Sequence, residues 1–316
     1  MKVEAEGKQP FAEVVKQYLE GPYLETLNSS MNKMFCGLPQ KLQLLPSARR
    51  AARMKQALCA VVQREFDARS QNRDHRTSHN LVDVRVAAAR QQPSNSPFNV
   101  ESLFRETSMY VISGINTIKR TLNGMLYNLA LYPEVATKLH SELEAHGLGA
   151  VSGAAPDLDL LESLPYLEAF LKESLRTLPV FYQAFDRVIL EDFTLGKHKF
   201  FRGDLIAIPY LSQFFREEYF PDPDRFDPDR FLGGLRGSVP PMAFIPFSAG
   251  KRMCIGRGLS EAVVKLFIVE MLQRYEVSLP VGSTPAAWKQ VDGEFLRTHY
   301  TVTCTPRVST TAHLSG

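Results

Sequence analysis

The sequence predicts a mainly α-helical fold with a small β portion toward its C-terminal side. Apolar residues recur at helical spacing through the first half of the chain, and strand-like alternation replaces this spacing after Pro179. A segment rich in proline and aspartate then separates the β portion from one more helical stretch. The chain of 316 residues can bury a sizeable core, and its 44% hydrophobic and 22% charged residues are typical of a globular protein.

The first half of the chain is expected to be helical. Helical spacing predicts helices over about Gln9–Leu19 and Ser47–Arg69. A long and unusually apolar helix is expected over roughly 100–131. Pro133 must end it, because proline fits the first turn of a helix and not its interior, and a second short helix follows to about Glu144.

The second half is expected to mix helices and strands. Pro165–Leu178 is predicted to be a helix, because its proline suits the first turn. Arg187–Leu195 and Lys199–Ile208 alternate like short strands. After the Pro/Asp segment, a helix is expected over about Gly256–Tyr275, and Leu296–Val308 alternates like a strand again.

The composition also excludes several classes of protein. A net charge of +3 without any Lys/Arg-rich run argues against nucleic-acid binding. No stretch has the length and apolarity of a transmembrane helix, and the first residues lack the apolar core of a signal peptide. The cysteines are scattered without a CxxC pair, which argues against a zinc site or a redox dithiol and favours a reducing compartment; they are Cys36, Cys59, Cys254 and Cys304.

The strongest chemical signal is the stretch FSAGKRMCIG, from Phe247 to Gly256, which directly precedes the last predicted helix. A cysteine just before a helix lies at the positive end of the helix dipole, which suits Cys254 to act as an anionic ligand. Gly250 and Gly256 allow a tight turn and the close approach of a flat ligand. Arg252 offers a forked donor suited to a carboxylate. The alternative is that Cys254 is only a small buried residue beside a glycine turn.

FSAGKRMCIG resembles the haem-binding signature FxxGxRxCxG of the cytochrome P450 family, with no departure at its defining positions. Three other segments resemble further motifs of this family, in the family's order. Lys172–Arg176 resembles its ExxR motif, and Phe226–Phe231 resembles its PERF motif, with Asp229 in place of glutamate. Ser113–Thr117 resembles the oxygen-binding segment of its long central helix.

This resemblance implies the C-terminal part of the cytochrome P450 fold: the long central helix, the ExxR helix, the Pro/Asp meander, the Cys-ligand loop and the helix that follows. It implies haem b as cofactor, with the Cys254 thiolate as axial ligand of the iron. Such a thiolate pushes electron density toward bound oxygen and favours O–O cleavage. Arg252 and Arg187 would then contact the haem propionates, although Arg187 could also be a plain surface charge. The loop residues expected at the haem are Phe247, Gly250, Cys254 and Gly256.

Glu173 and Arg176 are expected to support the haem site without touching substrate. They lie three residues apart on a predicted helix, so they share a face and can pair. By resemblance Arg230 joins them in a buried trio that holds the helix and the Pro/Asp segment beneath the haem. The alternative is a solvated surface ion pair, which would contribute little.

The distal side of the haem is expected on the long helix. By resemblance, Gly114 marks a local widening that makes room for oxygen, and Thr117 steers protons to it. The alternative for Gly114 is a packing glycine where another helix crosses. Asn116 departs from the family, which usually has an acid there. Because asparagine cannot release a proton as a carboxylic acid does, proton delivery is expected to be slower or to run through water or substrate.

Substrate and redox partner are expected on opposite sides of the haem. Substrate contacts are expected at Met109–Ser113, at Val180–Phe185 and at Phe295–Leu296. The aromatic residues Phe181, Tyr182 and Phe185 suggest an apolar substrate, although core packing explains them equally well. A reductase with an acidic surface could dock on the thiolate side, where the alternative is a solvated face; the cations expected there are Lys251, Arg257 and Lys265.

The expected organisation is a single partial domain over 1–316. Residues 1–99 form helices that precede the central helix, 100–308 form the haem-binding core, and 309–316 form a tail. The family's N-terminal portion carries a membrane anchor in eukaryotic types and a helix with haem-gripping Trp and Arg. Because the only tryptophan here is Trp288, the chain is expected to be an N-terminally truncated member without an anchor, similar to eukaryotic and especially fungal ones.

The expected function is a monooxygenase that inserts one atom of O2 into a lipophilic organic substrate, with secondary-metabolite biosynthesis as its setting. Electrons would come from NADPH through an NADPH–cytochrome P450 reductase. The full-length protein is expected at the cytosolic face of the endoplasmic reticulum membrane. Two alternatives remain open: a truncated, non-catalytic protein with impaired haem binding, and a haem-thiolate isomerase or dehydratase. The presence of Thr117 argues against the isomerase or dehydratase, since those branches of the family tend to lack this threonine.

Overall fold

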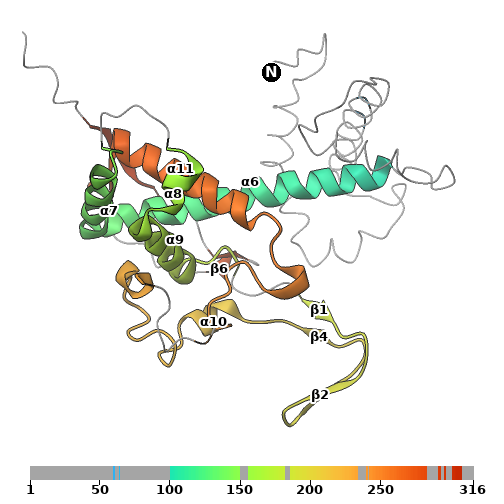
Figure 1. Cartoon of the computed structure of the whole chain (residues 1–316). Helices are drawn as coiled ribbons and strands as arrows, with labels where there is room; N and C mark the ends of the chain where they lie inside the picture. Colours follow the sequence, from blue (N-terminus) through green and yellow to red (C-terminus); the bar gives the residue numbers. More distant parts are fainter. Residues whose placement is uncertain are drawn as a thin grey trace, which may run out of the picture. The chain divides into compact units, whose positions relative to one another are not determined.

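The computed structural model describes residues 100–149, 156–181, 186–233, 242–282, 291–292, 295–296 and 301–307, and the single positions 60, 64 and 240 (Figure 1). The predicted helix over Gln9–Leu19 lies outside these residues. Of the predicted helix over Ser47–Arg69 only Ala60 and Arg64 are described, and both are helical. The chain divides into two units, Met1–Ser113 and Gly114–Gly316, and the second, which holds most of the described residues, is treated by itself below.

Helices α7 and α9 begin at the prolines that predict helix starts. α6 (Val100–Leu131) is followed by α7 (Pro133–Ala145), and α9 (Pro165–Thr177) likewise starts with a proline. The carboxylate of Glu142 in α7 accepts hydrogen bonds from the first free N–H groups of α9, at Tyr166 (2.6 Å) and Leu167 (2.9 Å). The other helices are α8 (Leu158–Glu162), α10 (Tyr210–Phe214) and α11 (Arg257–Arg274), with the short 3₁₀ helices η2 (Pro228–Phe231) and η3 (Gly250–Arg252).

The described strands form four small antiparallel pairs. They are β1 (Arg187–Val188) with β4 (Leu205–Ile206), β2 (Phe193–Leu195) with β3 (His198–Phe200), β5 (Tyr275–Ser278) with β8 (Thr303–Pro306), and β6 (Val291–Asp292) with β7 (Phe295–Leu296).

The predicted strands over Arg187–Leu195 and Lys199–Ile208 are each wrong in extent, because each is interrupted and forms two short strands. The second breaks at Gly203, which has a φ of +98°. Beside it, the carboxylate of Asp204 accepts a hydrogen bond from the N–H of Phe201.

The hydrophobic core lies among α6, α7, α9 and α11. Met125, Leu139, Leu167 and Ile268, one from each helix, are fully buried in a single cluster. The side-chain amide of Asn128 in α6 also donates to the hydroxyl of Ser174 in α9 at 3.3 Å, with both residues buried. The central helix, the ExxR helix and the helix after the cysteine loop are therefore held in one packed unit. No helix in the described part of the chain is long and apolar enough to cross a membrane.

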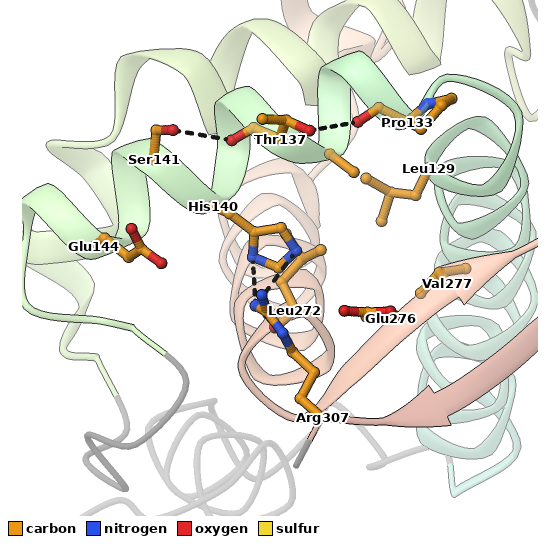
Figure 2. Close-up of a pocket in the computed structure, with 11 residues that line it drawn as sticks. Leu129, Pro133, Thr137, His140, Ser141, Glu144, Leu272, Glu276, Val277 and Arg307 are labelled. Atoms are coloured by element: carbon orange, nitrogen blue, oxygen red, sulfur yellow. Dashed lines mark hydrogen bonds between the residues drawn. The ribbon is translucent and has the colours of Figure 1, made fainter. Parts of the chain in front are cut away.

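A polar hollow of about 410 Å³ lies where α7, the end of α11 and β5 meet, and Figure 2 shows its lining. The guanidinium of Arg307 donates to Nδ1 of His140 at 2.9 Å and to the carbonyl of Leu272 at 3.2 Å. Burial first, and then the positive charge of Arg307, lower the pKa of His140, while the carboxylates of Glu144 and Glu276 oppose them. The ring is therefore held neutral as an acceptor that links α7 to the residue following β8.

We expect His140 to make stability depend on pH. Because its pKa is lower in the folded chain, the unfolded chain takes up the proton first as pH falls below the ordinary value of about 6.5. The contribution of His140 is therefore present above that pH and is lost as pH falls through the folded pKa. Thermal unfolding between pH 7.5 and 5 should show a shallower loss of stability for His140→Gln than for the wild type. His146→Gln, which changes an exposed histidine at the end of the same helix, should keep the wild-type slope; equal slopes for all three proteins would contradict this assignment.

Candidate functional site

The cysteine loop is closed by two backbone hydrogen bonds. The N–H of Cys254 donates to the carbonyl of Phe247 at 2.9 Å, and the N–H of Met253 donates to the carbonyl of Gly250 at 3.1 Å. Gly250 has a φ of +69°, a conformation that a side chain disfavours. Ser248 has a φ of +62° without being glycine, which costs on the order of 1–3 kcal/mol. The loop thus stores some strain while it presents Cys254 just before α11.

The surroundings of Cys254 leave its sulfur accessible. The residue is exposed and forms no disulfide, so the alternative of a buried small residue is wrong. A Cβ atom added at Gly256 would lie 3.9 Å from Sγ, so glycine leaves the space beside the sulfur open. Ile255 and Leu259 next to it are 83% and 70% exposed, which gives the loop and the start of α11 an uncovered apolar surface.

The two predicted propionate partners are both exposed. Arg252 ends η3, and it forms no hydrogen bond or ion pair with any residue that the structure describes. Arg187 lies in β1, where its guanidinium donates to the carbonyl of Asp186 at 3.3 Å. Haem needs one axial ligand, an apolar surface for the macrocycle and cations for its carboxylates. These residues fit haem: the exposed sulfur can be the axial ligand, Ile255 and Leu259 offer an apolar surface, and the two arginines are the cations.

The structure brings Glu173 and Arg176 of α9 together in the protein interior. Arg176 donates from Nε to Oε2 of Glu173 at 2.7 Å, and from its terminal nitrogen to Oε1 at 2.8 Å. Both side chains are 0% exposed, so the alternative of a solvated surface pair is wrong. A bidentate, charge-assisted pair of this kind is geometrically specific.

All five N–H donors of Arg176 are used. Besides Glu173, the guanidinium donates to three backbone carbonyls of the Pro/Asp meander and the segment before it, at Phe214 (3.0 Å), Pro223 (2.9 Å) and Arg225 (3.2 Å). The rings of Phe215 and Phe220 lie 5.2 and 5.4 Å from its centre. These partners were not predicted, because nothing in the local sequence shows where the meander will run.

Arg230 extends the same network into the meander. Its Nε donates to Oε1 of Glu173 at 3.2 Å, and the N–H of Asp227 donates to the same oxygen at 2.8 Å. The guanidinium of Arg230 also binds the carbonyls of Pro221, Asp222 and Arg225. Asp229, which replaces the family's glutamate, instead pairs with Lys138 of α7 at 2.6 Å. The meander is therefore tied both to α9 and to α7.

The oxygen-binding segment lies in an unbroken α-helix. α6 is continuous from Val100 to Leu131, so the predicted local widening at Gly114 is absent from the backbone. Among the residues that the structure describes, a side chain at Gly114 would meet nothing within 4 Å, so none of them supports the packing-glycine alternative. The hydroxyl of Thr117 donates to the carbonyl of Gly114 at 3.4 Å. Asn116, beside it, is partly buried.

The predicted substrate-contact residues are only partly described. Met109 and Tyr110 of α6 have exposed side chains, and Phe181 is partly buried. Tyr182 and Phe185 lie outside the described residues. Phe295–Leu296 forms β7.

Lys265 is not part of a docking surface, which corrects the sequence-based expectation. It is 7% exposed because it points toward α9, where its Nζ lies 2.6 Å from Glu168. Burial raises the pKa of Glu168, but hydrogen bonds from Lys265 and Lys172 outweigh it, so the pKa lies below its ordinary value. Arg257 is exposed, but it pairs with Glu261 at 3.0 Å and lies over the Phe247 ring at 5.8 Å. Lys251 is exposed.

The described residues have the architecture of a haem-thiolate protein. They combine a helical core, a buried Glu–Arg pair that holds the meander, and a cysteine loop with a glycine turn just before a helix. The family model described as Cytochrome P450 matches residues 7–302 of this chain. The chain therefore belongs to the cytochrome P450 family.

Curated relatives come from several animals. Human mitochondrial 25-hydroxyvitamin D-1 alpha hydroxylase is 34% identical over 58% of this chain and 36% of its own length. Cytochrome P450 3A15 of the guinea pig Cavia porcellus is 30% identical over 55% of this chain and 34% of its length. Steroid 17-alpha-hydroxylase/17,20 lyase of Oryzias latipes is 28% identical over 78% and 50%. This chain thus spans between about a third and a half of the length of these relatives.

Solved structures show the same fold. A zebrafish cytochrome P450 with abiraterone superposes with a TM-score of 0.75 at 22% identity, covering 95% of this chain and 66% of that one. A cyanobacterial cytochrome P450 with bound retinoic acid gives a TM-score of 0.71 at 21% identity, covering 90% and 63%. The mainly α-helical fold with small sheets, predicted from the sequence, is confirmed.

Proposed function

We propose that this chain carries the haem centre of a monooxygenase that inserts one oxygen atom from O2 into a lipophilic organic molecule. The observation that carries the proposal is the Cys254 loop, which presents an exposed sulfur at the start of α11. Cys254 would be the axial ligand of haem b, and Arg252 and Arg187 would hold its propionates. When bound, haem supplies oxygen activation, which a thiolate ligand promotes by donating electron density.

Thr117 would help to deliver the two protons that this chemistry consumes for each O2. Its hydroxyl can donate and accept at once, and it lies 3.4 Å from the carbonyl of Gly114. Asn116 can orient a water through its amide but cannot release a proton. Protons would therefore reach the distal side through water and Thr117.

Thr117→Ala is expected to leave haem binding intact and to divert reducing equivalents into hydrogen peroxide. The measurement is peroxide formed per NADPH consumed, in a reconstituted system with substrate. Thr121→Ala is the matched control, because Thr121 lies one turn further along α6 and its hydroxyl likewise binds a helix carbonyl, that of Thr117. Equal coupling in Thr117→Ala and in the control would rule out the proposed role of Thr117.

We further propose that electrons come from NADPH through an NADPH–cytochrome P450 reductase. The exposed Lys251 supports docking of a partner with an acidic surface, without Lys265. Names of the curated relatives refer to 25-hydroxyvitamin D and to steroids, which supports a large, mostly apolar substrate. A fungal origin, a role in secondary metabolism and residence at the endoplasmic reticulum stay predictions; the relatives named above are from animals.

The experiment that tests the function is turnover under ¹⁸O2 with a panel of sterol-like and other lipophilic compounds, a reductase and NADPH. A product that carries one ¹⁸O atom supports the proposal. A rearranged or dehydrated product without the label would support the isomerase or dehydratase alternative. A chain that binds haem poorly and turns over no compound would favour the non-catalytic alternative.

A further inference from the structure

The polar hollow beside His140 carries charged groups of both signs that form no ion pair within the described part of the chain. Arg307 donates to His140 and to the carbonyl of Leu272 through one terminal nitrogen, Nη1. Its Nε and Nη2 have no hydrogen-bond partner among the described residues, and their N–H groups form a planar fork that matches a carboxylate. Glu144 and Glu276 line the same hollow, and neither pairs with a described cation.

The rest of the lining suits a small organic ligand with an aliphatic chain. In Figure 2, Glu144 and Glu276 lie to either side of the Arg307 guanidinium. The hydroxyls of Thr137 and Ser141 donate to helix carbonyls at 3.0 and 3.1 Å, so their oxygens can accept from a ligand. The volume of about 410 Å³ is within the range of small-molecule sites. The remaining wall is apolar and is formed by Leu129, Pro133, Ala136, Leu272 and Val277.

We propose that this hollow binds a free dibasic amino acid of the lysine class. The ligand carboxylate would bind the fork of Arg307, and the two ligand ammonium groups would bind the carboxylates of Glu144 and Glu276. The methylene chain between them would lie on the apolar wall. Two cations and one carboxylate on the ligand match two glutamates and one arginine in the hollow, so that every charge has a partner.

Other ligand classes match the hollow less well. A simple anion would pair with Arg307 but would be repelled by two carboxylates. A metal ion fits less well, because the described residues contain no group of three His, Cys, Asp or Glu side chains that could hold one. The hollow lies at the C-terminal end of α11, whereas Cys254 precedes the N-terminal end of that helix. The amino acid would therefore bind outside the proposed haem site.

The test is isothermal titration calorimetry of the purified chain with three probes, at low and at physiological salt. They are L-lysine, L-norleucine, which lacks the side-chain amine of lysine, and cadaverine, which lacks its carboxylate. We expect lysine to bind about fivefold more tightly than either of the other two, since each of them loses one ion pair. Lysine binding should weaken as salt rises.

Variants of the hollow assign each ion pair. Glu144→Gln and Glu276→Gln should each weaken lysine binding about fivefold. In Arg307→Gln, lysine should lose its advantage over cadaverine, a ratio that a general loss of stability would not change. Glu134→Gln is the matched control, because Glu134 is an exposed residue of α7 that does not line the hollow, and it should bind lysine like the wild type.

The proposal is overturned if calorimetry detects no lysine binding, or if norleucine or cadaverine binds as tightly as lysine. It is also overturned if Glu276→Gln and Glu134→Gln bind lysine equally. Lysine binding does not depend on haem, so this proposal can fail while the monooxygenase proposal stands.

Discussion

Arg176→Lys should lower the free energy of unfolding by about 3–5 kcal/mol and loosen the meander. Lysine keeps the positive charge but offers three donors on one nitrogen, whereas Arg176 uses five N–H groups on five acceptor contacts. Carbonyls of the meander and one oxygen of Glu173 would be left buried without a hydrogen-bond donor. Each such unsatisfied group lowers the stability of the folded protein. Domains of this size are stable by only about 5–15 kcal/mol, so one such change removes a large share of the total.

The measurement for this prediction is urea unfolding followed by circular dichroism. Arg216→Lys is the control, because Arg216 also pairs with a carboxylate, that of Glu218, but with both side chains more than half exposed. An exposed pair contributes about 0–1 kcal/mol, so this variant should unfold like the wild type. The importance of the buried network would be refuted if the two arginine variants lost the same stability.

Cys254→Ser should remove the thiolate signature completely and lower the amount of haem that the protein retains. A serine hydroxyl is a poor ligand for haem iron, while the loop around it can keep its shape. The two hydrogen bonds that close the loop come from the backbone and do not involve the sulfur. The variant should therefore fold with wild-type stability. Haem retained after gel filtration and the thermal unfolding midpoint measure the two effects separately.

Cys304→Ser is the control for this variant, because Cys304 is the other described free cysteine and is also exposed. It lies in β8, opposite Val277 of β5, and not in the motif loop. It should keep both haem and the thiolate signature. If Cys304→Ser lost the signature and Cys254→Ser kept it, the assignment of the ligand would be wrong.

Local features of the fold could be predicted where a residue type or a residue spacing directly indicates them. Proline at 133 and 165 marks helix starts because it fits only the first turn, and both helices begin there. The pairing of Glu173 with Arg176 follows from helical spacing, and the structure shows the pair. The helix after the cysteine loop was predicted within one residue at each end, because a glycine precedes its apolar spacing.

Features that depend on distant segments could not be predicted. Lys265 was expected on the face nearest the thiolate, and its burial depends on the position of Glu168 on α9, which the sequence around Lys265 does not show. The carbonyl partners of Arg176 depend on the path of the meander, which has no periodic pattern to read. The break within the second predicted strand depends on a turn at Gly203, whose positive φ value glycine permits but does not require.

The central claim is that Cys254 binds haem iron as a thiolate. The purified chain, supplied with haem and reduced under carbon monoxide, should show the red-shifted Soret band of a thiolate-ligated iron. A reduced carbon monoxide spectrum without that band, in protein that is folded by circular dichroism, would contradict the claim.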